Sequence, residues 1–239
     1  MKYRNILKLT TYLPIFFLWC SPLLAHNEEF DTREQMRHEK EAKQASDSWN
    51  NFMLAVKSQD KENNLNKTHA SESQTTIHKN KESGLLIWTS KGNGFSIELI
   101  QLIPDFIRAT YGNHNFPPEE IERIAGYCLF GTIIQNTSQQ QVSYRVSDWR
   151  YIDKKGKSYP VKTKTQWLDE WKKAGITFSW TLLPDSGDFE VGDWQQGFTT
   201  VQLAREEKFD FVYNWTLDGV KHTATIKNMS CAPDELVLQ

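Results

Sequence analysis

The chain has few of the residue patterns that carry chemistry directly. It contains three cysteines and no C-x-x-C pair, so the usual thiol redox and zinc-binding patterns are missing. None of its six histidines stands in an H-x-H or H-E-x-x-H spacing. It also lacks a G-x-S-x-G nucleophile motif and a glycine loop that could bind phosphate. These absences favour a protein that is not an enzyme.

An excess of basic charge is also missing. The chain has 28 lysines and arginines against 30 aspartates and glutamates, a formal net charge of −2. Binding to nucleic acid depends on basic side chains that neutralise phosphates, and anionic membrane surfaces attract polybasic segments. We therefore exclude nucleic acid as a partner and expect no electrostatic attachment to a membrane.

Long apolar runs are absent except at the N-terminus, where one extends from Leu9 to Leu24. The run is shorter than the ~18–20 residues that a membrane-spanning helix needs, and Pro14 and Pro22 interrupt it. Basic residues precede it and Ala25 follows it, which is typical of a secretory signal peptide. We expect residues 1–25 to be removed, leaving a periplasmic or secreted protein without a stable membrane span. An uncleaved N-terminal anchor is the alternative.

Two cysteines remain after the signal, because Cys20 lies within it. In an oxidising compartment a pair of thiols usually forms a disulfide, so we predict a bond between Cys128 and Cys231. A cysteine metal site or a redox pair is the competing reading. Neither the spacing nor the neighbouring residues support it.

Residues 26–83 differ in composition from the rest and predict a polar arm that is partly helical or disordered. The stretch from Asp31 to Val56 could form a helix, whose apolar anchors are Phe30, Trp49, Phe52, Met53 and Val56. Residues 57–83 have the composition of a polar linker that cannot bury enough apolar surface to fold. We expect the folded domain to occupy residues 84–239.

From Gly84 onward the pattern is that of a β protein. The clearest segment alternates aromatic and polar residues from Phe209 to Leu217, followed by Asp218-Gly219, a two-residue type I′ turn. Pairing across this turn places Trp215 opposite His222, and the resulting apolar face needs a second sheet to cover it. We predict a mainly β, antiparallel sandwich with short helical insertions near residues 104–111, 116–125 and 166–174.

Two segments resemble known domains. The run from Phe130 to Ser138 and the later stretch from Asp153 to Tyr159 resemble the Ig-like domains of uncharacterised bacterial exported proteins. In those domains a buried strand ends at N-T/S and a later hairpin reads D-x-x-G-x-x-Y. The resemblance covers about residues 126–218 and implies an extracytoplasmic, non-enzymatic Ig-like fold without a defined ligand. The tryptophan-rich segment Gln166–Ala174 departs from that pattern.

Tryptophan is unusually frequent, with nine in the chain. Trp180 and Trp215 fall in expected strands and are predicted to lie in the core. Trp167, Trp171 and Trp194 fall in expected helix or loop and are candidate ligand-binding residues. Exposed tryptophans could stack on a sugar, as in carbohydrate-binding modules, or dock a protein; core packing is the alternative for all three.

A copper site is the candidate metal site. Cleavage after Ala25 would make His26 the mature N-terminus, where an α-amine and an imidazole can chelate Cu(II), as in histidine-brace proteins. His38 is the candidate for a second ligand, and a histidine at the cleavage position by chance is the alternative. The acids at positions 185, 188, 190 and 193 do not have the spacing of a calcium loop and are expected to be solvated. We expect no cofactor, with copper as the exception.

Taken together, the sequence predicts an exported, non-enzymatic binding or accessory protein of the cell envelope. Its partner would be a protein or another envelope component. A copper-binding protein using His26 and a carbohydrate-binding module using exposed tryptophans are the alternatives.

Overall fold

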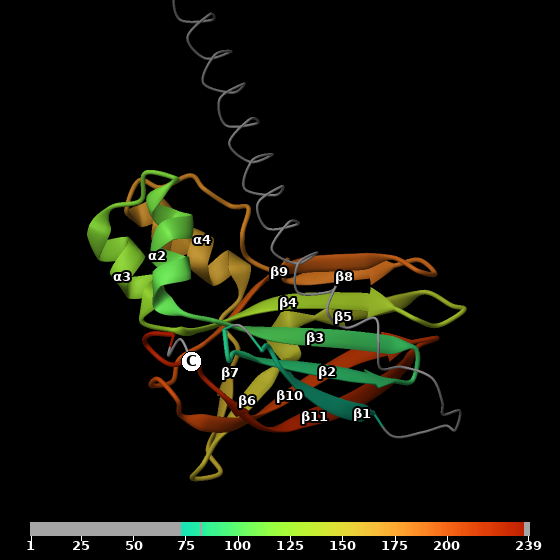
Figure 1. Cartoon of the computed structure of the whole chain (residues 1–239). Coiled ribbons are helices and arrows are strands. Elements are labelled where there is room, and N and C mark those ends of the chain that lie inside the picture. Colours follow the sequence, from blue (N-terminus) through green and yellow to red (C-terminus); the bar gives the residue numbers. More distant parts are fainter. Residues whose placement is uncertain (1–72, 82, 237–239) are drawn as a thin grey trace, which may run out of the picture. The chain divides into compact units, whose positions relative to one another are not determined.

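The computed structural model describes residues 73–81 and 83–236 (Figure 1). Within these residues the chain is mainly antiparallel β, with two sheets and three α-helices. None of the helices in this part of the chain is long and apolar enough to cross a bilayer. The expectation of a mainly β protein with short helices is therefore confirmed.

The first sheet consists of five strands in the order β1-β2-β3-β4-β9, all antiparallel to their neighbours. Their bounds are Gln74–Lys79 for β1, Leu86–Gly92 for β2, Phe95–Leu102 for β3, Cys128–Asn136 for β4 and Trp194–Val201 for β9. Strands β3 and β4 are the most completely buried of these: only Glu98 of β3 is partly exposed, and only Gln135 of β4 is exposed.

Strand β1 corrects the expected domain boundary. It lies inside residues 26–83, the predicted arm and linker, and pairs along its whole length with β2. The composition of this stretch is polar, but an edge strand needs only one hydrogen-bonding neighbour and tolerates exposed polar side chains. The folded part of the chain therefore begins before Gly84.

The second sheet is arranged around a central strand, β10. One edge of β10 pairs with β11, and the other edge pairs with β6 and then with β5. Strands β7 and β8 extend this sheet beyond β6 and β5. The bounds are Val142–Arg145 for β5, Arg150–Asp153 for β6, Ser158–Pro160 for β7, Ser186–Phe189 for β8, Lys208–Leu217 for β10 and Val220–Ser230 for β11.

The predicted hairpin is confirmed in β10 and β11. Trp215 pairs with His222, and the two rings stack with centroids 5.4 Å apart. Asp218 and Gly219 both have positive φ angles, 50° and 73°, as a type I′ turn requires. On the covered face, Trp215 stacks on Phe95 of the first sheet at 5.1 Å. The aromatic ladder is thus covered by a second sheet, as expected.

A single apolar core lies between the two sheets. Its largest side chains come from both of them: Trp88, Phe95 and Phe130 from the first, with Trp149, Phe211 and Trp215 in or beside the second. At one end of this core Cys128 and Cys231 are joined, with Cα atoms 5.2 Å apart. The link connects the first residue of β4 with the residue that follows β11, so it ties one sheet to the other.

Asn136 ties the sheets together at another point. Its amide nitrogen donates to the carbonyl oxygens of Gln140, Phe189 and Glu190, and its amide oxygen accepts hydrogen bonds from Ser138. A buried amide with every donor and acceptor used is stabilising, whereas an unsatisfied one is costly. The Asn-Thr-Ser segment therefore ends β4 and connects it to β8.

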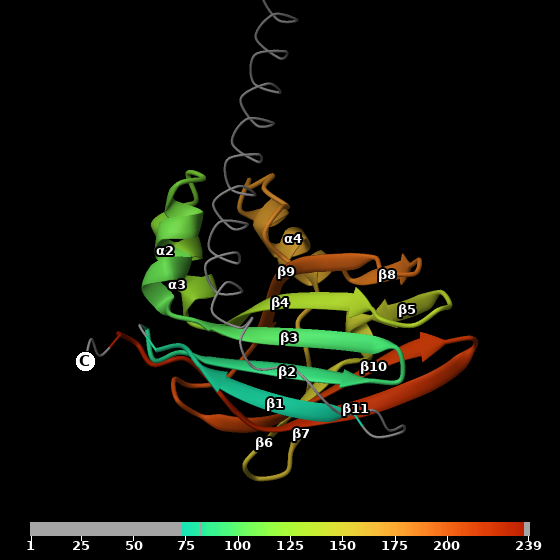
Figure 2. The same cartoon turned by 45° about the vertical axis from the view of Figure 1, so that its right-hand side comes forward.

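The three helices pack on the outer face of the first sheet, away from the second sheet (Figures 1 and 2). They are α2 (Pro104–Gly112), α3 (Pro118–Ala125) and α4 (Lys164–Lys173). Proline in the first turn starts α2 and α3, and a capping box between Thr163 and Gln166 starts α4. A second apolar cluster fills the space between these helices and the sheet.

One predicted strand is wrong. The strand expected around Trp180 does not form, because residues 176–183 contain only an isolated parallel bridge between Leu182 and Phe198. Leu183 lies so close to β9 that a side chain at Gly197 would collide with its backbone. Apolar residues in this segment, among them Phe178, instead pack against the second apolar cluster, which lies between the helices and the first sheet.

Candidate functional site

The structure places two of the three candidate ligand-binding tryptophans in the interior. Trp167 and Trp171 lie one helical turn apart on the inward side of α4, and both are fully buried. The indole Nε1 of Trp167 donates a hydrogen bond to Thr200 Oγ1 of β9 at 3.0 Å. Spacing of four residues on a helix that covers a sheet is the pattern of a buried face. The structure therefore favours core packing, the alternative given for these two residues, and ligand binding by them stays a prediction from the sequence.

The exposed tryptophans are Trp194 and Trp180. Trp194, the third candidate, begins β9 and is 56% exposed. Trp180 was predicted to lie in the core but is 62% exposed, because its segment does not form a strand. The bridge between Leu182 and Phe198 brings the segment that carries Trp180 alongside β9.

A third large apolar side chain adds to this exposed surface. Val191, in the turn between β8 and β9, is 52% exposed and stands three residues before Trp194. We call Trp180, Val191 and Trp194 the tryptophan surface. Large apolar side chains that remain exposed on a folded protein are typical of a binding surface.

The nearby acidic residues serve the fold. Asp185 accepts hydrogen bonds from the backbone N–H groups of Lys164 and Thr165, the first two residues of α4. This places a carboxylate at the N-terminus of a helix, where negative charge is stabilising. Asp193 accepts a hydrogen bond from the backbone of Glu190 and holds the turn before β9.

Metal binding finds no support in the described part of the chain, in which no group of three or more His, Cys, Asp or Glu is placed to hold a metal ion. His26 and His38 lie outside the described residues. Copper binding through them therefore stays a prediction from the sequence.

A charged cluster surrounds the ring of Trp167. The Nζ of Lys162 lies 3.6 Å from the centre of that ring and 2.6 Å from Glu170 Oε2. Arg123 of α3 pairs with Glu170 and Glu120 and lies 5.1 Å from the same ring. Cation–π contacts and ion pairs here join α3, α4 and the segment before α4. Sequence reasoning missed this cluster because its members are far apart along the chain.

The charged groups in this cluster shift the pKa values of Glu170 and Lys162. Partial burial would raise the pKa of Glu170, but hydrogen bonds from Lys162 and Arg123 outweigh it, so the pKa falls below the usual 4.5. Partial burial lowers the pKa of Lys162 and outweighs the opposing hydrogen bond to Glu170. The cluster therefore favours the ionised carboxylate of Glu170.

Replacing Glu170 with glutamine should weaken the acid dependence of stability. Because the pKa of Glu170 is lower in the folded state, its contribution is present above pH 4.5 and is lost as pH falls through the folded-state value. We expect Glu170→Gln to lower the free energy of unfolding by about 1 kcal/mol near neutral pH, after allowance for solvent screening. Urea titrations should show this difference shrinking below pH 4.5.

Glu119→Gln, on the exposed side of α3, is the matched control and should leave the acid dependence unchanged. A difference between Glu170→Gln and the wild type that stays constant from neutral pH down to complete acid unfolding would contradict the assigned role.

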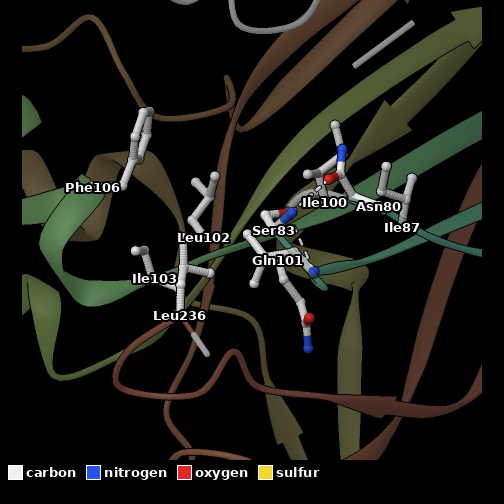
Figure 3. A pocket seen from close by; sticks show the side chains of 10 residues that line it. Asn80, Ser83, Ile87, Ile100, Gln101, Leu102, Ile103, Phe106 and Leu236 are labelled. Atoms are coloured by element: carbon white, nitrogen blue, oxygen red, sulfur yellow. Dashed lines mark hydrogen bonds between the residues drawn. The ribbon is translucent and has the colours of Figure 1, made fainter. Parts of the chain in front are cut away.

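An apolar pocket lies between β2, β3 and α2 and has a volume of about 160 Å³ (Figure 3). The side chains that line it include Ile87, Ile100, Leu102 and Phe106. Leu236, near the C-terminus of the chain, also lines it. The amide of Gln101, also in the lining, is used structurally, since it accepts from Leu86 N and donates to Ser230. The pocket can therefore accept apolar groups but presents no catalytic set.

The described residues thus contain an exposed tryptophan surface, one member of which begins β9, and an apolar pocket lined from β2, β3 and α2. Both can bind a ligand or a partner. Among the described residues, neither brings together a nucleophile and an acid–base group. Family models, curated proteins and solved structures were each compared with the chain, and none of the three comparisons found a match.

Proposed function

We propose that this chain is an exported, non-enzymatic binding protein of the cell envelope that docks a protein partner on its tryptophan surface. Export is supported by the signal-like N-terminus and by the joined pair Cys128 and Cys231, since such bonds persist in oxidising compartments. The same two features support a periplasmic or secreted location.

The exposure of Trp180 and Trp194 carries the proposal. The chain buries its other described tryptophans completely or almost so, and these two are the exceptions. Tryptophan is strongly enriched among the residues that dominate the energetics of protein interfaces. Two exposed indoles, with the exposed Val191 three residues before one of them in the chain, support a surface that becomes covered by a partner.

Carbohydrate binding is the second candidate. A single exposed indole such as Trp194 can stack on a sugar ring, and this observation keeps the candidate open. Trp167 and Trp171 no longer contribute to it, because both are inside the helical cluster. We favour a protein partner since the exposed side chains include Val191, which offers apolar area and no hydrogen bond to a sugar.

Copper binding is a third candidate, carried only by the sequence. It requires His26 as the mature N-terminus, with His38 as a possible second ligand. Mass spectrometry of the mature N-terminus decides the first condition, and a start at another residue would end this candidate.

The Ig-like resemblance also stays a proposal. A bond between the two sheets, from Cys128 to Cys231, supports it. The strand order differs from that of immunoglobulin constant domains, because β1 to β4 are consecutive neighbours in one sheet. We therefore propose a sandwich related to Ig-like domains in architecture, with its own strand order.

Photo-crosslinking in the native compartment tests the tryptophan surface. A photoreactive phenylalanine at position 180 or 194 should give a discrete protein adduct, whereas one at Thr225, exposed on β11, should give none. The double variant Trp180→Ala, Trp194→Ala should lose partner capture while its stability changes by less than about 0.5 kcal/mol, as for exposed sites. Adducts no stronger than at position 225 would contradict the proposal, and binding on a glycan array that depends on Trp194 would favour the sugar.

A further inference from the structure

A row of apolar side chains crosses the outer face of the first sheet. Ile87 of β2 pairs with Ile100 of β3, Ile100 with Gly131 of β4, and Gly131 with Phe198 of β9. Ile133 lies two residues further along β4 and so faces the same side. We call Ile87, Ile100, Ile133 and Phe198 the outer patch.

The outer patch is buried although it faces away from the core between the sheets. Ile87 and Ile100 are 2% exposed and Ile133 is 9% exposed. Of the two apolar clusters formed in the described part of the chain, neither includes any of these three isoleucines. The pocket beside α2 is lined by Ile87 and Ile100 and continues the same apolar surface (Figure 3). Because these three isoleucines are buried and yet belong to neither cluster, we infer that they are covered by another part of the chain with an apolar face of its own.

The sequence before the first sheet contains one segment with such a face. Trp49, Phe52, Met53 and Val56 stand at positions i, i+3, i+4 and i+7, the spacing that places side chains on one face of a helix. Of the four positions between them, Asn50 and Asn51 are polar, and Leu54 and Ala55 are apolar. Trp49 and Phe52 are the only Trp, Phe or Tyr residues between positions 31 and 72 of the sequence.

We propose that the segment from Trp49 to Val56 docks as a helix on the outer patch of its own chain. The segment brings apolar side chains of the size that the patch and its adjoining pocket can contact. Its apolar face would meet Ile100, Ile133 and Phe198, and its polar face would remain in water.

The length of the connection permits this docking. Roughly 16 residues separate Val56 from Ser73, and an extended chain of that length spans up to about 50 Å. The chain then enters β1, the edge strand of the same sheet. A tethered segment has a millimolar effective concentration and avoids most of the entropy cost of association. These two facts favour the chain's own segment over a second copy or a partner's helix.

Hydrogen–deuterium exchange of the full mature chain tests the proposal. Backbone amides of residues 49–56 should be protected in the wild type, and Phe52→Glu should reduce that protection by at least about tenfold. Ile133→Glu, on the sheet side of the contact, should do the same. Leu65→Glu in the connection and Thr225→Glu on β11 are the matched controls and should leave the protection unchanged.

Photo-crosslinking identifies the occupant. A photoreactive phenylalanine at position 52 should crosslink within one chain to β3, β4 or β9. Free exchange of residues 49–56 in the wild type would overturn the proposal, and so would crosslinks that join two chains or a partner. If Ile133→Glu fails to fold, Phe52→Glu still decides, because it leaves every residue of the two sheets unchanged. Crosslinking from position 194 tests the tryptophan surface separately, so the two proposals can fail independently.

Discussion

Replacing both Cys128 and Cys231 with alanine should lower the free energy of unfolding by about 4–5 kcal/mol. The two residues are separated by 103 positions, and a link across so long a loop removes much conformational freedom from the unfolded chain. Both residues are buried where the start of β4 meets the end of β11, so the link also holds the two sheets together. Urea titration followed by tryptophan fluorescence measures the change.

Reduction provides the matched control for this experiment. Wild-type protein measured with a strong reductant should have nearly the same stability as the double variant, because both then lack the link. A double variant that loses less than about 1 kcal/mol would contradict the role assigned to the pair. Intact-mass data that show two free thiols in protein from its native compartment would contradict it as well.

Replacing Trp167 with alanine should destabilise the protein by about 3–5 kcal/mol, the usual range for a fully buried tryptophan. The change would open a cavity beside Trp171, whose ring centre lies 5.6 Å away. It would also remove the hydrogen bond to Thr200 and the closer of the two aromatic contacts of the Lys162 ammonium, leaving only the ring of Tyr127 at 5.2 Å. Urea titration gives the size of the effect, and hydrogen exchange of α4 locates it.

Trp194→Ala is the matched control, since Trp194 is exposed and contributes no ring to either cluster. Its effect on stability should stay below about 0.5 kcal/mol. A loss of stability at Trp194 equal to that at Trp167 would mean that the exposed tryptophan is structural. The tryptophan surface would then lose its main argument.

Local patterns in the sequence were sufficient for part of the fold. The alternation from Phe209 to Leu217 and the Asp218-Gly219 turn set the register of the last hairpin, which the structure confirms. Such a pattern is local, because the two-residue turn brings neighbouring segments together and fixes which residues face each other. The same holds for α2 and α3, which form near the predicted residues and begin at proline.

Other parts could not be predicted because their environment comes from distant segments. Strand β1 has a polar sequence, and only the open edge of β2 makes it a strand. The candidate site was misjudged for the same reason. The helical spacing of Trp167 and Trp171 was correctly recognised, but a helix pattern does not say which of its faces is exposed until the sheet beneath it is known.

By itself, the sequence determined the class of the protein: a mainly β chain with a signal-like start, two cysteines suited to a bond, and no catalytic motif. These properties depend on composition and on residues close together in the chain. Only the tertiary structure decided which tryptophans are exposed and where the apolar pocket lies. Burial is a sum over neighbours contributed by several strands and helices, so it is determined by packing and not by the local pattern.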